Sequence, residues 1–397
     1  METEKKLRKQ VEHYVEEIVN KSLEIVMNAT YGNRQLNRNT VSKVHKKVND
    51  VNLSNGDTNV KQFAECLVDE SFKEGLEEVD KLSKIKPILC VGIVTLDFVT
   101  ISEEYPAEDS KTIAVGNYWS RGGNAANTAT VLAHLGARVE YFGTIVNNRW
   151  MSLLQDDFKN NGVSTEHCIY LDHEKHKAPV ATLITSQKTG TRTVIADFKG
   201  ITGVTYEQFS SLNIGKYGLI HLESRSFEGR AGDIADIIAL IVKHNETNVE
   251  SEKIVISVEI EQSNITNPEF RSLFAQGDIV LIGKDYAIDD GYTSKEEAVR
   301  GLYKYCKPDA ILVCAWGDDG AAAMFDEQLV CSPAITPEKL VDTLGEGDTF
   351  NAGFIYAFSR GKSVAKAVKF GCMVAGHKCG CNGFSCVKGM QRNMYQI

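Results

Sequence analysis

The chain has 397 residues, of which 43% are hydrophobic and 24% charged, a composition typical of a folded globular protein. Its net charge of −9 argues against a nucleic-acid-binding protein, which would carry a basic patch, and no apolar run approaches the length that spans a membrane. The first residues are charged and lead into no apolar stretch, so we expect no secretory signal and a cytoplasmic protein with reduced cysteines.

Residues 1–86 differ in pattern from the rest of the chain and predict a helical N-terminal extension with a polar linker. Two segments, 11–29 and 63–79, repeat apolar residues at positions i, i+3, i+4, i+7 and i+8, the pattern of an amphipathic helix. The polar stretch 49–57 between them is typical of a linker. Basic residues do not dominate the polar faces of these helices, so we do not expect them to lie on a membrane.

From residue 87 to residue 397 the pattern changes to strands that alternate with helices. Short apolar runs predict buried strands at 88–94, 217–222, 254–258, 279–282 and 311–315. Helical stretches separate several of them, at 125–135, 231–244 and 294–306. This alternation predicts an α/β domain with a mainly parallel sheet covered by helices. Segments 112–120 and 180–197 break the alternation, and we interpret them as a small antiparallel lid over the edge of the sheet.

The stretch from Asp342 to Gly353 carries the strongest functional signal. It places Gly345, Gly347 and Asp348 where a turn leads into an apolar, helix-forming run. Glycines let backbone N–H groups approach a ligand, and a helix start adds unpaired N–H donors and a positive dipole end, which suit an anion. Asp348 beside such a pocket could accept a proton, an arrangement that suits phosphoryl transfer. The alternative is an ordinary loop with an Asp N-cap and glycines for its turn.

Polar residues also follow the first predicted strand and open the first predicted helix. Asp97 lies just beyond that strand, at the edge where open α/β sheets bind ligands. Residues 121–127 form a second glycine turn, in which Gly123 permits close backbone approach while Asn124 and Asn127 face the same side of the helix start. Amides beside a carboxylate suit a polyol, whose hydroxyls need donors and acceptors. A turn-capping Asp and an Asn-capped helix are the alternatives.

Three further features carry weaker signals. The loop 315–320 follows a strand and is either a ligand loop or a tight acidic turn. Arg192 on the predicted lid either reaches phosphate oxygens or is merely solvated. Three cysteines within 379–386 have the spacing C-x-C-x4-C, without a second cysteine pair or a histidine pair nearby, so we predict no metal site there.

Taken together, these segments resemble the PfkB carbohydrate kinases, also called the ribokinase-like family. The two signature regions are 122–127 and 342–353, and the resemblance spans about residues 87–390 in order and without large gaps. Within the family the chain is most similar to the ketohexokinase group, a similarity carried by segments 88–97, 119–127, 221–223, 257–261, 314–316 and 370–380. The resemblance implies a ribokinase-like three-layer α/β/α sandwich with a small β-sheet lid. It also implies ATP-dependent phosphorylation of D-fructose at the 1-hydroxyl.

The same resemblance implies roles for individual residues. Asp348 would be the base that takes the proton of the attacking hydroxyl, and Gly345, Glu346 and Gly347 would line the anion hole. The residues implied to hold the sugar are Asp97, Gly123, Asn124 and Asn127, with Asp109 as a lid acid that reaches the sugar of the partner protomer. The residues implied to contact ATP are Arg192, Gly317, Asp318, Asp319 and Gly320. The implied cofactors are ATP and Mg²⁺, with K⁺ as a further candidate, and the implied assembly is a homodimer joined through the lids.

Two departures from the family pattern stand out. The usual G-A-G-D reads Gly345-Glu346-Gly347-Asp348 here. A carboxylate beside a phosphate site would repel it, but only the backbone N–H of that position is needed, so we expect Glu346 to point outward and activity to be retained. The N-x-x-E motif common in ribokinases is replaced by Gly283-Lys284-Asp285, much as in ketohexokinases.

Three functions remain open at this point: a fructose kinase, a PfkB kinase for another sugar or a nucleoside, and a catalytically silent sugar-binding scaffold. The amphipathic segments 11–29 and 63–79 resemble the docking helices of A-kinase anchoring proteins, so a helix-docking protein partner is one candidate for the extension. Packing onto the catalytic domain or self-association is the alternative that we favour.

Overall fold

The computed structural model describes residues 85–198, 200–227, 229–261, 268–391 and 394. The chain divides into two compact units, Met1–Ile85 and Lys86–Ile397, and all described residues except Ile85 belong to the second. Both predicted amphipathic helices, 11–29 and 63–79, lie outside the described residues. Within the described part, none of the helices combines the length and the apolar character needed to cross a membrane.

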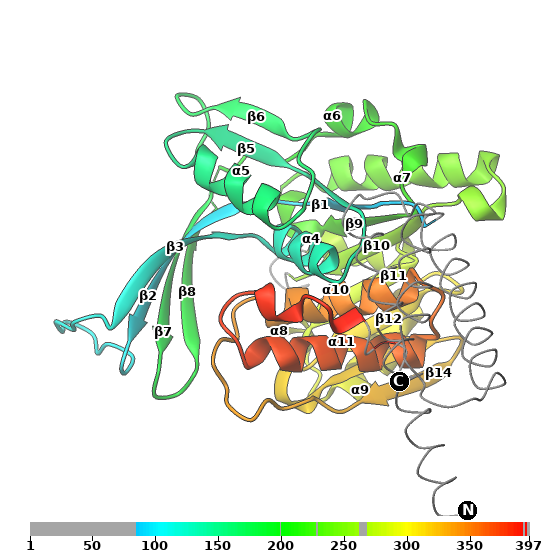
Figure 1. Cartoon of the computed structure of the whole chain (residues 1–397). Helices are drawn as coiled ribbons and strands as arrows, with labels where there is room; N and C mark the ends of the chain where they lie inside the picture. The colour runs from blue at the N-terminus through cyan, green and yellow to red at the C-terminus, as the bar shows by residue number, and fades with distance from the viewer. Residues whose placement is uncertain (1–84, 199, 228, 262–267, 392–393, 395–397) are drawn as a thin grey trace, which may run out of the picture. The chain divides into compact units, whose positions relative to one another are not determined.

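An eight-stranded sheet forms the centre of the second unit (Figure 1). Its strands follow the order β14-β13-β12-β11-β10-β9-β1-β4. The strands from β12 to β4 are parallel, whereas β13 and β14 run antiparallel at one edge. They are β1 (Ile88–Val91), β4 (Val139–Phe142), β9 (Leu219–Glu223), β10 (Val255–Ile260), β11 (Ile279–Gly283), β12 (Ile311–Ala315), β13 (Ala321–Phe325) and β14 (Gln328–Ser332). The predicted mainly parallel sheet is confirmed.

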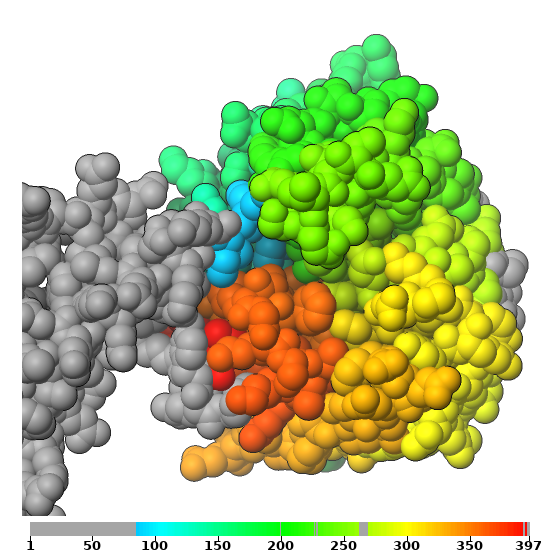
Figure 2. Space-filling model, turned by 90° about the vertical axis from the view of Figure 1, so that its right-hand side faces the viewer, coloured from blue at the N-terminus to red at the C-terminus, as the bar shows by residue number. Residues whose placement is uncertain are grey.

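Helices bury both faces of this sheet. Successive strand residues point to opposite faces, so Ile88 and Cys90 of β1 join one apolar cluster while Leu89 and Val91 join another. The first cluster includes α4 (Asn124–His134), α10 (Glu346–Phe358) and α11 (Val364–Cys379), and the second includes α7 (Ala231–Thr247), α8 (Lys284–Asp289) and α9 (Lys295–Leu302). In Figure 2 the green segments lie above, and the yellow and orange segments lie side by side below them. The fold is the expected three-layer α/β/α sandwich.

The remaining elements are short. Two further helices are α5 (Met151–Asn160) and α6 (Tyr206–Ser210), and β5 (Thr144–Asn147) pairs in parallel with β6 (Ile169–Asp172). The 3₁₀ helices are Ile214–Lys216, Ser224–Phe227, Glu250–Glu252, Pro268–Ala275, Tyr303–Tyr305, Gly317–Asp319 and Ser385–Val387. The helix predicted over 294–306 is therefore shorter, because α9 ends at Leu302 and a 3₁₀ turn follows it.

The lid is a separate four-stranded sheet of order β3-β2-β7-β8, which projects from the body (Figure 1). Its strands are β2 (Thr95–Ser102), β3 (Gly116–Gly122), β7 (Val180–Ser186) and β8 (Arg192–Asp197). The prediction of a purely antiparallel lid was wrong, because β2 and β7 pair in parallel. The strand predicted over 88–94 is confirmed over 88–91, but its predicted end was wrong, because β1 ends at Val91 and the chain then leaves the central sheet to form β2.

Candidate active site

A cavity of about 730 Å³ lies between the lid and the carboxyl ends of the central strands. Side chains from β2, β7, β8, β10 and β11 line it, together with the first turns of α4 and α10. Its volume is in the range of small-molecule sites. Of the residues predicted to form a site, those that line this cavity are Asp97, Gly123, Asn124, Asn127, Arg192, Gly317, Asp318, Gly320, Gly345, Glu346, Gly347 and Asp348.

Asp348 lies in the first turn of α10, with 7% of its surface exposed. Asn127 Nδ2 of α4 donates a hydrogen bond to its Oδ2 at 2.8 Å. Burial, together with the negative charge of Glu259, raises the pKa of Asp348 well above its usual range. A buried carboxylate with a raised pKa and a fixed orientation is suited to accept a proton from a bound hydroxyl.

The start of α10 presents backbone donors to the cavity. Gly345 is the N-cap residue in the left-handed conformation, with φ 72°. A Cβ at this position would lie 2.6 Å from the ring of Phe384, so the turn requires glycine. Among the described residues, no acceptor bonds the backbone N–H of Gly347 or Asp348. These donors and the helix dipole make the start of α10 fit for an anion.

A buried ion pair holds the turn that precedes α10. The Lys378 side chain is fully buried, and its Nζ donates to the backbone oxygen of Asp342 and to Asp342 Oδ2, each at 2.8 Å. Asp342 Oδ1 accepts from Leu344 N at 2.8 Å, and Oδ2 also accepts from Gly383 N at 3.1 Å. Asp342 therefore connects three segments: α11 through Lys378, the loop after α11 through Gly383, and the turn before α10 through Leu344.

The expectation that Glu346 points outward was wrong. Its side chain lines the cavity and is only partly exposed. Burial raises the pKa of Glu346, while the positive charges of Arg192 and Lys378 and the nearby Cys379 side chain oppose that rise. Arg192 Nη1 of the lid also donates to Thr343 Oγ1 at 2.8 Å, which brings the guanidinium to the same turn. Two cations beside Glu346 make its partial burial tolerable.

Two buried acids at the ends of β9 and β10 were missed as site residues. Glu223 and Glu259 are register partners on these strands, and burial raises the pKa of each to about 7. Arg225 bonds Glu223 Oε1 at 3.1 Å, and Asn351 Nδ2 donates to Glu259 Oε1 at 3.1 Å. Each acid directly follows a predicted strand, 217–222 or 254–258, but this signal is weak because the sequence does not show that the two strands are neighbours.

Asn124 connects α4 to this acidic cluster. Its Nδ2 donates to Glu259 Oε1 at 3.3 Å, and its Oδ1 accepts from Arg225 Nη2 at 2.9 Å. Gly123, the N-cap of α4, has φ 103°, and a Cβ there would lie 2.2 Å from the backbone oxygen of Ile93. The glycine turn therefore places both α4 amides at the cavity wall, as the sequence predicted.

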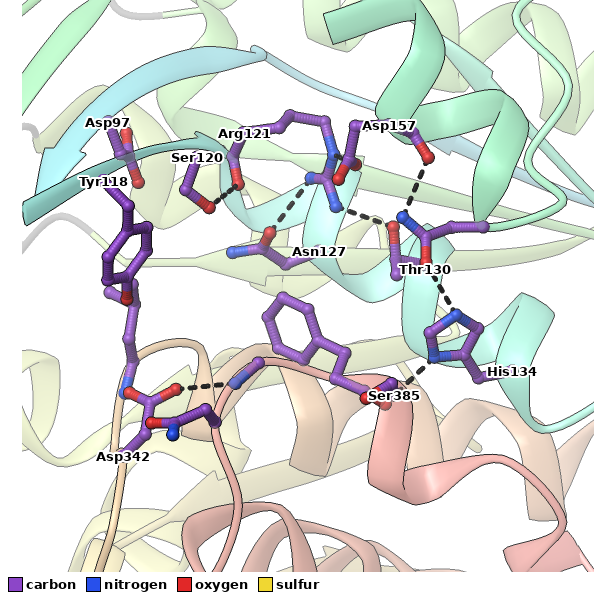
Figure 3. Close-up of a pocket in the computed structure, with 15 residues that line it drawn as sticks. Asp97, Tyr118, Ser120, Arg121, Asn127, Thr130, His134, Asp157, Asp342 and Ser385 are labelled. Atoms are coloured by element: carbon purple, nitrogen blue, oxygen red, sulfur yellow. Dashed lines mark hydrogen bonds and ion pairs between the residues drawn. The ribbon is translucent and has the colours of Figure 1, made fainter. Parts of the chain in front are cut away.

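A smaller hollow of about 310 Å³ is shown in Figure 3. Asp97 and Asn127 line both spaces. Arg121 Nη1 donates to Asn127 Oδ1 at 3.0 Å, and Arg121 Nη2 donates to Thr130 Oγ1 at 2.7 Å. Thr95 Oγ1 donates to Asp97 Oδ1 at 2.6 Å, and burial raises the pKa of Asp97. Arg121 thus orients the amide whose other end bonds Asp348.

Two predicted residues do not line the cavity. Asp319 belongs to the 317–320 loop, but its carboxylate pairs with Lys295. Asp109 lies in the exposed turn between β2 and β3, with φ 55°. Its predicted role requires a second protomer, so it stays a prediction.

Comparison with known proteins identifies the family. The model of the pfkB family carbohydrate kinases matches residues 86–386. The chain belongs to this family. It is therefore a sugar kinase, a phosphotransferase for which ATP is the expected phosphoryl donor, as the sequence predicted. Mouse ketohexokinase is 38% identical to this sugar kinase over 300 residues, which cover 75% of the chain and 98% of the mouse protein. The predicted similarity to ketohexokinases is confirmed.

Solved structures confirm the fold of this sugar kinase. Ribokinase from Giardia lamblia has a TM-score of 0.65 at 13% identity, and the match covers 78% of this chain and 98% of the ribokinase chain. Adenosine kinase from Sinorhizobium meliloti has a TM-score of 0.61 at 19% identity, and the match covers 78% of this chain and 98% of the adenosine kinase chain. At such identities the likeness shows the ribokinase-like fold and nothing finer.

Proposed function

We propose that this sugar kinase transfers a phosphoryl group from ATP to the 1-hydroxyl of D-fructose. The observation that carries the proposal is the position of Asp348, buried at the start of α10 and held by Asn127 at 2.8 Å. The choice of fructose rests on the 38% identity to mouse ketohexokinase.

The sugar would lie among donors and acceptors from the lid and α4. Asp97 at the base of β2 supplies carboxylate oxygens, while Asn124 and Asn127 supply amides. A polyol needs such a mixture, because each hydroxyl both donates and accepts. Gly123 leaves room for the sugar to approach the backbone.

The residues around the cavity fit ATP and Mg²⁺. Glu259 Oε2 is buried and has no hydrogen-bond partner among the described residues, and a carboxylate oxygen of this kind suits Mg²⁺ or its water shell. Arg192 and the backbone of the 317–320 loop would hold the nucleotide. ATP supplies the phosphoryl group, and bound Mg²⁺ neutralises charge on it.

Asp348 then acts as the base for the sugar hydroxyl. Its raised pKa lets it accept the proton as the new O–P bond makes the hydroxyl acidic. The free N–H groups of Gly347 and Asp348 stabilise negative charge on the phosphoryl oxygens. Arg192 lies on β8 of the lid and bonds Thr343, so the lid and the start of α10 act together to exclude water.

A catalytically silent sugar-binding protein is the second candidate, and the partly buried Glu346 favours it. Its carboxylate lines the cavity beside the N-terminus of α10, where it competes with a phosphate for the same positive potential. A PfkB kinase for another sugar or a nucleoside is the third candidate, because the lining residues recognise hydroxyls in general.

ADP release from the purified protein with Mg-ATP tests these functions, using fructose, ribose, adenosine and no sugar. We expect fructose-dependent release that falls at least about a hundredfold in Asp348→Asn, since general base catalysis contributes this much. Asp236→Asn on α7 is the matched control, because that acid lies outside the cavity. Folded protein that binds fructose without turnover contradicts the kinase mechanism and supports the silent candidate. Exchange of KCl for choline chloride in the same assay tests K⁺ as an activator.

A homodimer through the lid is proposed as the assembly. All of β8 is exposed, and Ile195, which does not line the cavity, presents an apolar side chain that is 60% exposed. Sedimentation of the wild-type chain and of Ile195→Glu tests this, and a wild-type monomer would contradict it. The docking role of segments 11–29 and 63–79 stays a prediction.

A further inference from the structure

Three metal-ligating side chains converge at the end of α11, outside the cavity described above. His377 lies in the last turn of the helix, Cys381 follows two residues after its end, and Cys386 lies in the next 3₁₀ turn. One ligand atom from each lies within 4.8 Å of the other two. The 379–386 segment therefore folds back on the helix and brings together residues that no zinc-type spacing in the sequence indicates.

We propose that His377, Cys381 and Cys386 form a binding site for Zn²⁺. Two thiolates and one imidazole are soft and borderline donors, which select Zn²⁺ over the hard cations Mg²⁺ and Ca²⁺. Tetrahedral zinc with Zn–S of about 2.3 Å places its ligand atoms about 3.8 Å apart, so the ligand atoms of the cluster, which lie within 4.8 Å of one another, need to approach by at most about 1 Å.

The contacts around the cluster orient its ligands. His377 Nε2 lies 3.2 Å from the backbone oxygen of Cys386, and an imidazole that donates through Nε2 has Nδ1 left to bind a metal. Cys381 Sγ lies 3.5 Å from the backbone oxygen of His377, which keeps the thiol against the helix end. Such outer hydrogen bonds fix ligand orientation in metal sites.

Access to solvent distinguishes this site from a closed zinc site with four protein ligands. His377 is exposed and the two cysteines are partly exposed, so three protein ligands leave a fourth position open to water or to a further ligand. Cys379, which the sequence pattern groups with Cys381 and Cys386, is instead buried against Glu346. The metal site therefore uses the histidine and only two of the three cysteines.

The site encloses a loop that contacts the start of α10. Between the two cysteines, Gly383 N donates to Asp342, and the Phe384 ring packs on Gly345. His134 Nδ1 of α4 lies 2.9 Å from the backbone oxygen of Phe384. Zinc bound at both ends of this loop would restrict it, and so would stabilise the segment that supports the α10 turn. This inference does not depend on which sugar the protein phosphorylates.

Zinc titration of the full-length, reduced and metal-free chain tests the site, with a chromophoric chelator as competitor. We expect one equivalent of Zn²⁺ with an increase in melting temperature, and a loss of affinity of at least about tenfold in Cys381→Ser, Cys386→Ser and His377→Gln. Exposed residues outside the cluster provide matched controls, Cys331→Ser and His173→Gln, which should bind as the wild type does.

Co²⁺ substitution gives a second readout that is independent of folding stability. Thiolate-to-cobalt charge-transfer absorption should appear in the wild type, be halved in either cysteine variant and be retained in Cys331→Ser. Binding that is unchanged in all three ligand variants, or the absence of Zn²⁺ binding in the reduced chain, overturns the proposal. A Cys381–Cys386 disulfide formed on mild oxidation, in a chain that binds no Zn²⁺ when reduced, would assign the pair to thiol chemistry instead.

Discussion

Replacement of Lys378 by methionine tests whether the buried ion pair holds the start of α10. The Lys378 side chain is fully buried and its ammonium makes two hydrogen bonds of 2.8 Å to Asp342, whose side chain is only 15% exposed. Met keeps the apolar stem but leaves a buried carboxylate uncompensated, which costs about 3–5 kcal/mol. In a domain of this size each kcal/mol lowers the melting temperature by about 2 °C, so a loss of about 6–10 °C is expected.

Urea unfolding and thermal melting measure this loss, and Lys307→Met is the matched control. Lys307 also binds one backbone oxygen and one carboxylate, those of Gln276 and Asp278, but its side chain is 30% exposed. Its replacement should cost at most about 1 kcal/mol. In Lys378→Met with Asp342→Asn, the unpaired charge is gone and part of the stability should return. Equal stability of Lys378→Met and the wild type would refute the reasoning.

Three further variants test the site. Burial raises the pKa of Glu259 from 4.5 to about 7, so between these pH values the folded chain binds more protons than the unfolded chain. The free energy of unfolding therefore falls as pH rises, by up to about 1.4 kcal/mol per pH unit for this carboxyl. Urea unfolding of Glu259→Gln over this pH range should show a shallower fall than the wild type, and an unchanged slope would contradict this reasoning. Gly123→Ala places a Cβ 2.2 Å from a backbone oxygen and should lower the free energy of unfolding by more than about 3 kcal/mol. Gly162→Ala, which has open space around it, should cost only the roughly 1–2 kcal/mol of a left-handed residue. Equal losses of stability in the two variants would show that the contact at Gly123 is unimportant. Glu346→Ala should lower KM for ATP roughly tenfold by removing a carboxylate beside the anion site, and an unchanged KM would show that Arg192 and Lys378 already neutralise it.

Local patterns predicted most of the fold because buried parallel strands are short apolar runs bounded by helices. Only the end of the strand predicted over 88–94 was wrong, since apolar character alone does not show where a strand leaves its sheet. At Gly92 a Cβ would lie 2.3 Å from Glu223 Oε2, so this glycine is required by a residue that lies more than a hundred positions further along the chain. The parallel pairing of β2 with β7 likewise depends on contacts between distant segments.

The residues of the candidate site likewise divide into those that the sequence predicts and those that it does not. The glycine turns at Gly123 and Gly345 and the acid Asp348 were predictable, because each turn and the helix that follows it are contiguous in sequence. Glu223 and Glu259 were not, because a single acid at a strand end is common, and only the register of β9 with β10 brings these two together. The pairing of Lys378 with Asp342 across 36 positions has no sequence signal either.

Glu346, which stands where the family usually has alanine, shows why a side chain at an anion site can differ without abolishing phosphoryl transfer. The donors at the start of α10 are backbone N–H groups, which any residue other than proline supplies in the same geometry. The change therefore adds a negative charge but removes no donor, and Arg192 and Lys378 lie where they oppose that charge. Both cations are tied to the same turn, Arg192 through Thr343 and Lys378 through Asp342. This balance favours an active sugar kinase with a weakened hold on ATP over a silent scaffold.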